Sequence, residues 1–417
     1  MSKPKIRFKG YCNDWERRKL SELMISLQNN TLSRANLSKE TGVAKNVHYG
    51  DVLIKFGEVL DVSKEQLPMI LDESVMTKYK SSFLHNGDVI VADTAEDSTV
   101  GKCSEIAGVN DEVVMAGLHT IPYRPVEKFA TGYLGYYLNS NAYHNQLIPL
   151  MQGIKVTSIS KSVMQDTNIV YPKSIEEQAM IGNYFQYLDH LITLHQRQCE
   201  NTKKLKKFML QKMFPKKNQK NPEIRFAGFT NDWERRKVGE LLEERNEQAP
   251  MSEDYPLMAF IANQGVAPKG ERYDRSALVN DETGKKYKRT KYGDFIYSSN
   301  NLETGSIGLN KYGNACISPV YSIFKPTGKT ELDFLGRRFL RKDFINEMVR
   351  WRQGVVYGQW KIHETDFMKI EVTIPSVEEQ QKIGNYFDAL DHLITLHQNK
   401  CDELKKLKKF MLQNMFI

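Results

Sequence analysis

The sequence has few cysteines and no long apolar run. Five cysteines occur in 417 residues, and they are widely spaced, odd in number and free of CxxC pairs. Such spacing indicates neither a disulfide framework nor a zinc site. No segment approaches the roughly 18 apolar residues that span a bilayer, and the first residues lack the apolar stretch of a signal peptide. We therefore expect a cytoplasmic chain that binds no metal and enters no membrane.

Two motifs of catalytic proteins are also missing. An amino-methyltransferase grips a flipped base with Asn or Asp followed by two prolines and an aromatic residue, and the nearest string, NPE at 221–223, does not qualify. A nucleotide-binding P-loop requires GxxxxGK followed by Ser or Thr, which GKK at 284–286 does not meet. The sequence therefore predicts neither methyl transfer nor ATP hydrolysis by this chain.

One acidic stretch leaves an alternative open. Asp88, Asp93, Glu96 and Asp97 lie close together in sequence and could hold the metal of a nuclease. A strand followed by an acidic turn explains the same residues.

The composition is that of a folded protein of about two domains. Apolar residues make up 40% and charged residues 26% of the chain, and the net charge is +8. A modest positive charge permits an anionic partner such as nucleic acid but does not require one.

An internal repeat dominates the sequence. The block IRFKGYCNDWERRKLSEL at 6–23 returns at 224–241 with 13 of 18 positions identical, and the block at 181–214 returns at 383–416 with 26 of 34 identical. Between these blocks the two halves share only scattered anchors, and the second middle is 16 residues shorter. The repeat predicts two related domains. We call the repeated blocks their common frame; the stretches between the blocks differ.

The stretches between the repeated blocks predict an α+β fold of mixed structure. Short β-branched and aromatic runs, DVLIKF at 51–56, GDVIVAD at 87–93, GDFIYSS at 293–299 and IEVTIP at 370–375, are typical of strands. One helix is expected over 129–147 and a counterpart over 331–351. Ser174 and Ser376 then precede acidic turns and predict the N-caps of two long helices.

The long helices carry a coiled-coil pattern. Apolar residues recur at alternating spacings of four and three from Ile181 and from Ile383, with His195 and His397 in the seam. A polar seam residue more often fixes register than binds a metal. Connectivity requires an antiparallel pair with a globular domain at each end, and 39 residues of helix span roughly 58 Å. Further apolar residues widen the stripe beyond one seam, which indicates an outside partner.

These observations predict five segments. They are a first mixed domain at 1–175, a central long helix at 176–214, a linker at 215–222, a second mixed domain at 223–377 and a distal long helix at 378–417.

The repeat pattern suits duplex DNA, whose backbone has two-fold symmetry while its sequence does not. NDWERRKLSEL opens the first half and EEQ, IGNYF and LDHLITLHQ close each half, with a Gln-Gly pair shortly before. This layout resembles the specificity (S) subunits of type I restriction-modification enzymes along essentially the whole chain. The resemblance implies a non-catalytic DNA-reading subunit that assembles with two methyltransferase (M) subunits and, for cleavage, with restriction (R) subunits. It also implies adenine-N6 methylation at a bipartite target, with S-adenosylmethionine, ATP and Mg²⁺ bound by the partners and no cofactor by this chain.

We expect DNA contacts from the polar stretches after each Gln-Gly pair, although turn and capping roles explain the same residues equally well. These candidates are Gln152, Lys155, Thr157, Ser158, Ser160 and Lys161 in the first half, and Gln353, Tyr357, Gln359, Trp360 and Lys361 in the second. A basic cluster, Lys285, Lys286, Lys288 and Arg289, and the arginines of 337–352 are candidates for phosphate contacts or for a solvated face.

The repeated helices should bind the same partner twice, as M subunits would. The residues expected to form the seam or the partner surface are Phe185, Leu188, Leu191, Ile192 and Phe208, with Phe387, Leu390, Leu393, Ile394 and Phe410 in the second helix. A stand-alone DNA-binding regulator built from a duplicated domain remains the alternative function, and an enzyme with an unrecognised site is a second.

Overall fold

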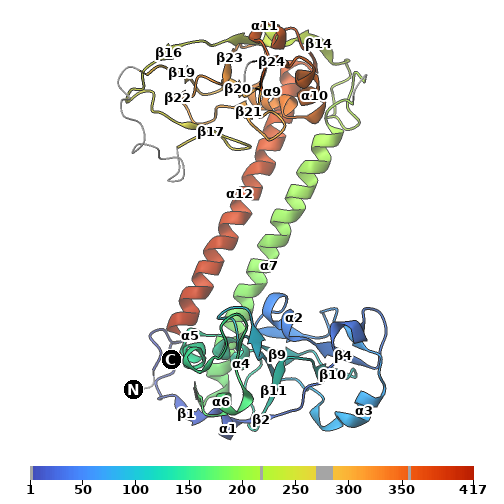
Figure 1. The fold of residues 1–417 in the computed structure, drawn as a ribbon, viewed down its shortest axis with the longest axis vertical. Coiled ribbons are helices and arrows are strands. Elements are labelled where there is room, and N and C mark those ends of the chain that lie inside the picture. Colours follow the sequence, from blue (N-terminus) through green and yellow to red (C-terminus); the bar gives the residue numbers. More distant parts are fainter. Residues whose placement is uncertain (1–2, 217–218, 269–284, 356–357) are drawn as a thin grey trace. The chain divides into compact units, whose positions relative to one another are not determined.

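The computed structural model describes residues 3–216, 219–268, 285–355 and 358–417. The chain forms two compact units, which Figure 1 shows with their elements labelled. Unit 1 comprises residues 1–197 together with 398–417, and unit 2 comprises residues 198–397. Each unit therefore contains one part of each long helix.

Unit 1 is a mixed α/β domain, as predicted. Its strands are β1 (Glu16–Lys19), β2 (Met24–Ser26), β3 (Leu37–Ser38), β4 (Ala44–Val47), β5 (Val59–Asp61), β6 (Met69–Ile70), β7 (Val89–Ala92), β8 (Thr94–Ala95), β9 (Cys103–Ala107), β10 (Val114–Ala116), β11 (Thr120–Pro125), β12 (Thr157–Ser158) and β13 (Asn168–Tyr171). Its short helices are α1 (Leu20–Leu23), η1 (Arg34–Asn36), α2 (Tyr49–Ile54), α3 (Ser74–Lys78), η2 (Lys80–Ser82), α4 (Tyr133–Leu138), α5 (Asn141–Leu147), η3 (Ile148–Leu150) and α6 (Lys161–Gln165).

The main sheet of unit 1 has the order β2-β11-β7-β9-β5, antiparallel except where β5 runs parallel to β9. A second sheet has the order β10-β4-β6-β3. Val89 and Val91 of β7 face one buried cluster, while Ile90 and Ala92 face another. The strand predicted from GDVIVAD is therefore confirmed, and its continuous apolar run follows from burial on both faces.

Unit 2 has the same kind of mixed structure. Its strands are β14 (Glu234–Lys237), β15 (Leu242–Glu244), β16 (Gln248–Ala249), β17 (Ala259–Ile261), β18 (Gly265–Ala267), β19 (Tyr287–Thr290), β20 (Phe295–Tyr297), β21 (Ile307–Leu309), β22 (Ala315–Ile317), β23 (Ser322–Pro326), β24 (Gln353–Val355), β25 (Gln359–Lys361) and β26 (Glu371–Ile374). Its short helices are α8 (Val238–Leu241), α9 (Leu332–Phe339), α10 (Lys342–Arg350) and α11 (Glu364–Phe367). The main sheet has the order β15-β23-β20-β21, and the strands predicted from GDFIYSS and IEVTIP are β20 and β26.

Two predictions of local structure were wrong. The run 51–56, predicted as a strand, lies in and after helix α2, because His48 Nδ1 accepts the Gly50 N–H at 3.2 Å and begins a helical turn. Val52 and Phe56, four residues apart, are buried while Ile54 is exposed, which is a helical period.

The single helices expected over 129–147 and 331–351 are each two helices. In unit 1, α4 ends because Asn139 Nδ2 donates to the Gly135 carbonyl at 2.7 Å and Ser140 Oγ donates to the Tyr137 carbonyl at 2.6 Å. In unit 2, the backbone of Arg341 is extended between α9 and α10. Its guanidinium donates to the carbonyl of Leu210 in the long helix.

The repeated frame makes the same contacts in both units. The strand pair β1–β13 corresponds to β14–β26, and Trp15 and Trp233 are both buried. Arg7 pairs with Glu177 at 2.6 and 2.8 Å, and Arg225 pairs with Glu379 at 2.7 Å through both its Nε and its Nη2.

The glutamine of each EEQ motif also serves the frame. Gln178 donates to the Pro172 carbonyl at 2.8 Å and accepts the Ala130 N–H at 3.0 Å. Gln380 donates to the Pro375 carbonyl at 2.9 Å and accepts the Glu331 N–H at 3.0 Å. These two residues tie the start of each long helix to its domain, which explains why EEQ recurs.

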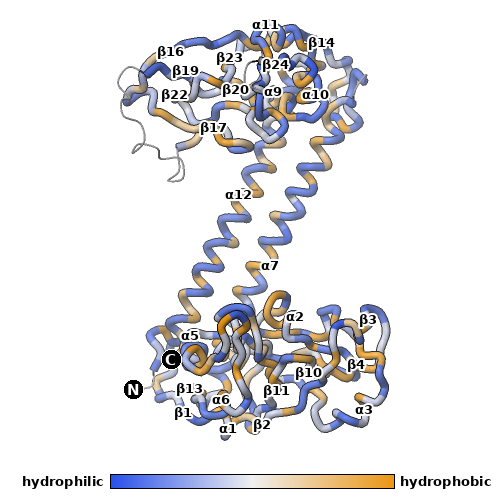
Figure 2. The backbone as a smooth tube through the Cα atoms, viewed as in Figure 1, coloured by the Kyte–Doolittle hydropathy of each residue, from blue (hydrophilic) through white to orange (hydrophobic). Residues whose placement is uncertain are grey.

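The long helices are α7 (Ile175–Lys212) and α12 (Val377–Asn414). Ser174 Oγ accepts the Glu177 N–H at 3.2 Å and Ser376 Oγ accepts the Glu379 N–H at 3.4 Å, as the predicted caps require. Apolar residues recur along both helices in Figure 2, as the seam requires. No helix in the described residues is long and apolar enough to cross a membrane.

The two helices pack antiparallel within each unit. In unit 1, Cys401 Sγ lies 3.6 Å from the Ile192 carbonyl, and Phe416 stacks on Phe185. In unit 2, Cys199 Sγ lies 3.7 Å from the Ile394 carbonyl. Low residue numbers of α7 thus meet high numbers of α12, as predicted.

Candidate nucleic-acid interface

The stretch after the first Gln-Gly pair forms a β-hairpin, which we call the first Gln-Gly hairpin (residues 152–158). Gln152 and Ser158 exchange two backbone hydrogen bonds of 2.9 and 2.8 Å. Gly153 has φ +113°, and a Cβ there would lie 2.0 Å from the Val156 carbonyl oxygen. Only glycine fits this turn. The side chains of Gln152, Ile154, Lys155, Val156 and Ser158 are exposed, and Thr157 is half-buried.

The second Gln-Gly pair also forms a hairpin, made by strands β24 and β25, with Gln353 opposite Lys361. Gln353, Gln359 and Trp360 are exposed. The Trp360 N–H donates to Asn300 Oδ1 at 2.6 Å, which ties β25 to the loop after β20. Lys361 Nζ lies 2.7 Å from Glu364 Oε1, so this lysine already has an acidic partner.

One predicted contact residue in this half, Tyr357, lies outside the described residues.

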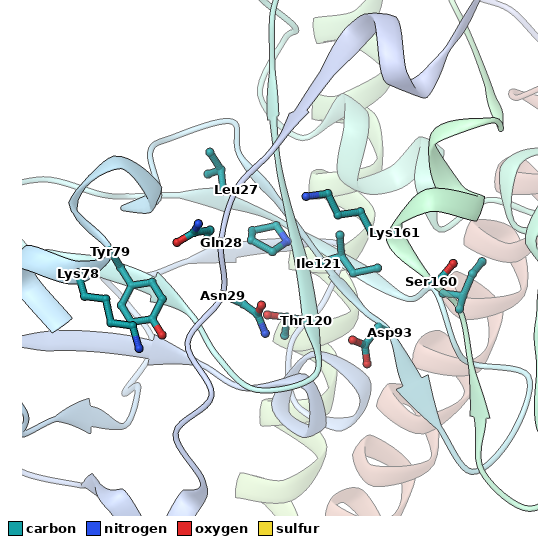
Figure 3. A pocket seen from close by; sticks show the side chains of 12 residues that line it. Leu27, Gln28, Asn29, Lys78, Tyr79, Asp93, Thr120, Ile121, Ser160 and Lys161 are labelled. Atoms are coloured by element: carbon teal, nitrogen blue, oxygen red, sulfur yellow. The ribbon is translucent and has the colours of Figure 1, made fainter.

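A cleft of about 480 Å³ in unit 1 adjoins the first Gln-Gly hairpin. Gln28, Asn29 and Tyr79 lie on one side of it and Ser160 and Lys161 on the other (Figure 3). The remaining lining residues are Leu27, Lys78, Asp93, Thr120, Ile121, Pro122 and Ile159. The cleft therefore brings two of the predicted contact residues together with side chains from segments up to 134 positions away.

Sequence reasoning missed the amide side of this cleft. Asn29 Nδ2 donates to the Gly117 carbonyl at 3.1 Å, whereas the Gln28 side chain lies at the cleft surface. Lys78 Nζ lies 5.1 Å from the centre of the Tyr79 ring. The signal available in the sequence was the QNN string shortly after strand β2, because Gln and Asn are the side chains that pair with adenine edges.

Several basic candidates of unit 2 have partners within the fold. Lys288 is buried and donates to the Tyr321 carbonyl at 2.9 Å, and burial lowers its pKa. The Arg289 guanidinium lies 4.5 Å from the centre of the Tyr255 ring. Lys285 and Lys286 are exposed. Of the four side chains of this cluster, Lys285 and Lys286 are therefore the most open to a phosphate.

The arginines of α9 and α10 are likewise paired. Arg337 bonds Asp388 at 2.5 Å and Asp391 at 3.0 Å, and Arg338 bonds Asp343 at 3.0 Å. The remaining pairs are Arg341 with Asp343, Arg350 with Glu347 and Arg352 with Glu303. Their positive charge is largely balanced within the unit.

The acidic stretch of unit 1 is divided among structural roles. Asp88 accepts two hydrogen bonds from Arg124 at 3.0 and 2.7 Å, and Asp97 accepts the Thr99 N–H at 2.9 Å. Asp93 accepts from Thr94 Oγ1 at 2.7 Å. Across the part of the chain that the structure describes, no three acidic, histidine or cysteine side chains converge as metal ligands.

A second surface lies on the long helices. The predicted seam residues Phe185, Leu188, Ile192, Phe387 and Leu390 are buried in the unit cores. At the edge of the stripe, Leu191 and Ile394 are half-buried and Leu393 is exposed.

Three exposed apolar residues of each unit on these helices fall at positions that are equivalent in the repeat. We call these two sets the apolar triads; they are Leu194, Leu407 and Phe410 in unit 1 and Leu396, Leu205 and Phe208 in unit 2.

Ion pairs fix these helices to the domains. In unit 1, Lys408 Nζ contacts Asp189 at 2.7 Å and Glu58 at 2.8 Å, and Tyr136 Oη donates to Asp189 at 2.7 Å. In unit 2, Asp391 accepts from Lys206 as well as Arg337. Lys206 and Lys408, which occupy equivalent positions in the repeated helices, are therefore structural.

The fold consists of two Gln-Gly hairpins on a repeated frame with paired helices. Comparison with known proteins identifies the class of protein that has this fold. The sequence profile of the type I restriction modification DNA specificity domain matches residues 13–204 and 230–406, so the chain belongs to this family. It is a DNA specificity subunit of a type I restriction-modification system.

Relatives and a solved structure agree with this assignment. The chain is 23% identical over 414 residues to a Methanocaldococcus jannaschii protein named as the specificity subunit of the type I restriction enzyme MjaX, covering 95% of this chain and 91% of the relative. It is 23% identical over 279 residues to the MjaVIII specificity subunit of the same organism, covering 62% and 63%. The crystal structure of a type I S subunit from M. genitalium superposes with a TM-score of 0.59 at 14% identity, covering 100% of this chain and 99% of that one, which shows a common fold.

Proposed function

We propose that unit 1 and unit 2 each read one half of a bipartite, asymmetric DNA target. The observation that carries this proposal is the contrast between a repeated frame and two different Gln-Gly hairpins, QGIKVTS in one and QGV with QWK in the other. Two different reading surfaces on one repeated frame suit two different base sequences. On this proposal the recognition domains are residues 1–175 and 223–377, and residues 215–222 are a linker.

Base reading and backbone contact are divided among these residues. Gln152, Gln353 and Gln359 are exposed and can pair with base edges, as can Gln28 in the cleft. Lys155, Lys161, Lys285 and Lys286 are exposed and suit phosphates, and Thr157, Ser158 and Ser160 suit the sugar-phosphate backbone.

The helix pair would have two roles in the complex, which are to set the distance between the half-sites and to bind the methyltransferase subunits. Each long helix has 38 residues, about 57 Å at the standard rise. We propose that this length sets the nonspecific gap between the half-sites. The exposed apolar triads, Leu194, Leu407 and Phe410 and their copies, would each bind one methyltransferase subunit, because equivalent surfaces bind the same partner twice.

The chemistry would then belong to the partners. Two methyltransferase subunits would bind S-adenosylmethionine and methylate adenine N6, and restriction subunits would use ATP and Mg²⁺ for cleavage. This chain would direct both activities in the cytoplasm without binding a cofactor itself.

Mapping N6-methyladenine across a genome tests the proposal. The chain would be expressed with and without its methyltransferase partner in a host that lacks a type I system. A bipartite motif with a fixed gap, present only when both proteins are expressed, is the expected result. Methylation by this chain alone would reveal a catalytic site, and an absence of methylation with an active partner would favour a stand-alone DNA-binding regulator.

A further inference from the structure

We propose that Ile154, at the tip of the first Gln-Gly hairpin, contacts a thymine methyl group in the major groove and so sets part of the sequence that unit 1 recognises. The inference rests on the proposed function, in which unit 1 contacts duplex DNA. It adds an apolar contact to a surface whose other candidates are polar.

The exposure of Ile154 is extreme. Its side chain is 101% exposed, and Val156 two residues later is 53% exposed. Single exposed apolar side chains are common on proteins and need no explanation by themselves. This one, however, projects from a loop that is held at both ends by the Gln152–Ser158 hydrogen bonds and folded around Gly153. A side chain on such a loop is presented to a ligand at little entropic cost.

The charge along the segment that carries the hairpin favours DNA as the occupant, although strand β8, which pairs with residues 157–158, leads into the exposed Glu96 and Asp97. Residues 128–165 contain no Asp or Glu, although the chain average of 51 acidic residues in 417 would place about five in a segment of that length. Lys155 and Lys161 are exposed on either side of the hairpin's second strand, with hydroxyl side chains between them. An exposed apolar tip within a segment free of acidic residues fits duplex DNA, because the phosphates are anionic and the bases between them carry apolar groups.

The narrow tip of the hairpin suits the major groove, although strand β12 behind the tip also pairs with β8. A two-stranded β-ribbon fits the major groove, which is about 12 Å wide, whereas the minor groove is only about 6 Å wide. The thymine C5 methyl is the apolar group that a base pair presents in the major groove. Ile154 carries only carbon atoms on its side chain, so an apolar contact is the readout it can perform.

The hairpin of unit 2 carries Val355 after its Gln-Gly pair, where the first hairpin carries Ile154, and it exposes an apolar side chain at another position. There, Trp360 is 49% exposed on strand β25 and is flanked by Gln359 and Lys361. A flat indole and a branched aliphatic chain present surfaces of different shape to the base edges. This difference agrees with two half-sites of different sequence.

The test uses the complex of this chain with its methyltransferase subunits. After the target has been mapped, binding is measured by fluorescence anisotropy on DNA in which each thymine of the unit 1 half-site is replaced singly by deoxyuridine, which lacks the methyl. We expect one position to weaken binding by about fourfold, the factor that corresponds to burial of one methyl-sized group. In Ile154→Ser the same replacement should have no further effect, while Ile154→Ser on thymine DNA binds about fourfold more weakly.

Ile54→Ser is the matched control, because Ile54 is 89% exposed on helix α2 of the same unit. It should bind every DNA as the unmodified chain does. Equal binding by Ile154→Ser and the unmodified chain would overturn the inference, as would a deoxyuridine effect that persists in Ile154→Ser. Loss of assembly with the methyltransferase subunits in Ile154→Ser would overturn it too, because the hairpin would then be a protein interface. Failure of the proposed function itself shows earlier, as an unmodified complex with no preference for a bipartite site.

Discussion

Phe416, which follows helix α12, stacks on Phe185 with ring centroids 5.7 Å apart and planes 18° from parallel. It also meets Trp15 edge-on at 6.5 Å. Phe214, which follows α7, makes the equivalent contacts in unit 2, with Phe387 at 6.2 Å and Trp233 at 6.2 Å. The residues after each long helix thus complete the core of a unit.

Phe416→Ala should destabilise unit 1 by about 3 to 5 kcal/mol, because it opens a cavity among buried aromatic rings. Urea unfolding monitored by circular dichroism measures the change. Phe410→Ala in the preceding helix is the control, since Phe410 is 53% exposed. It should change the free energy of unfolding by less than about 1 kcal/mol. Equal effects of the two substitutions would show that Phe416 does not close the core.

Lys408→Gln should destabilise unit 1 by about 2 kcal/mol at neutral pH, because Asp189 and Glu58 lose their shared cation in a partly buried site. Burial raises the pKa of Asp189, and Lys408 opposes this rise. The variant should therefore recover stability as pH falls and Asp189 becomes protonated. Lys409→Gln, at an exposed neighbouring position, should show neither effect. A destabilisation that does not vary with pH would speak for lost packing alone.

Glu105 should make unit 1 less stable as pH rises toward neutrality. Its carboxylate accepts the N–H groups of Gly132 at 2.6 Å and Gly135 at 2.9 Å, and burial raises its pKa to about 7. Between the unfolded pKa of about 4.5 and this value, the folded state keeps a proton that the unfolded state has released. The free energy of unfolding should fall by roughly 3 kcal/mol across that window and level off above pH 7.

For Glu105→Gln the quantity to compare is the slope of the free energy of unfolding against pH. The absolute stability changes for another reason, because the amide oxygen replaces only one of the two carboxylate acceptors. Urea unfolding from pH 4.5 to 8 should give a shallower pH dependence for Glu105→Gln than for the unmodified chain. Glu40→Gln, at an exposed position in unit 1, should retain the full slope. An unchanged slope in Glu105→Gln would assign the pH dependence to other groups.

Phe208→Ser and Phe410→Ser should each remove one methyltransferase subunit from the complex, since each phenylalanine belongs to one exposed apolar triad. Native mass spectrometry would then show one partner bound in place of two, and the double variant should bind none. Lys207→Ser and Lys409→Ser test whether any substitution on the exposed face acts in the same way. Retention of both partners by the double variant would place the interface elsewhere.

Insertion of one helical turn into ENTKKLKK of α7, at residues 200–207, with a matching insertion in α12, should lengthen the gap of the methylated motif while leaving both half-sites unchanged. Genome-wide methylation mapping reads the outcome directly. The two half-sites serve as the internal control for folding. An unchanged gap would mean that the helices do not act as a spacer.

The periodicity and repeats in the chain were sufficient to predict the frame. The seam residues, the Ser174 and Ser376 caps and the buried Trp15 and Trp233 are all local or repeated patterns, and local patterns determine helices and strands. The same reasoning failed at 51–56, where a run rich in β-branched residues is largely helical. Tertiary packing of Val52 and Phe56 outweighed the local preference there.

The site depended far more on tertiary structure. Gln28 and Tyr79 join Ser160 and Lys161 in one cleft only because the sheets of unit 1 bring those segments together. Lys288 and Arg337 are basic residues in the sequence, yet burial and nearby carboxylates give them structural roles. A sequence pattern records the period and chemistry of neighbours along the chain, whereas the pairing of a charge or the lining of a cleft depends on residues that only folding makes adjacent. The amino-acid sequence thus determined two related units on a repeated frame with long helices, and tertiary contacts decided which of their polar side chains remain open to a ligand.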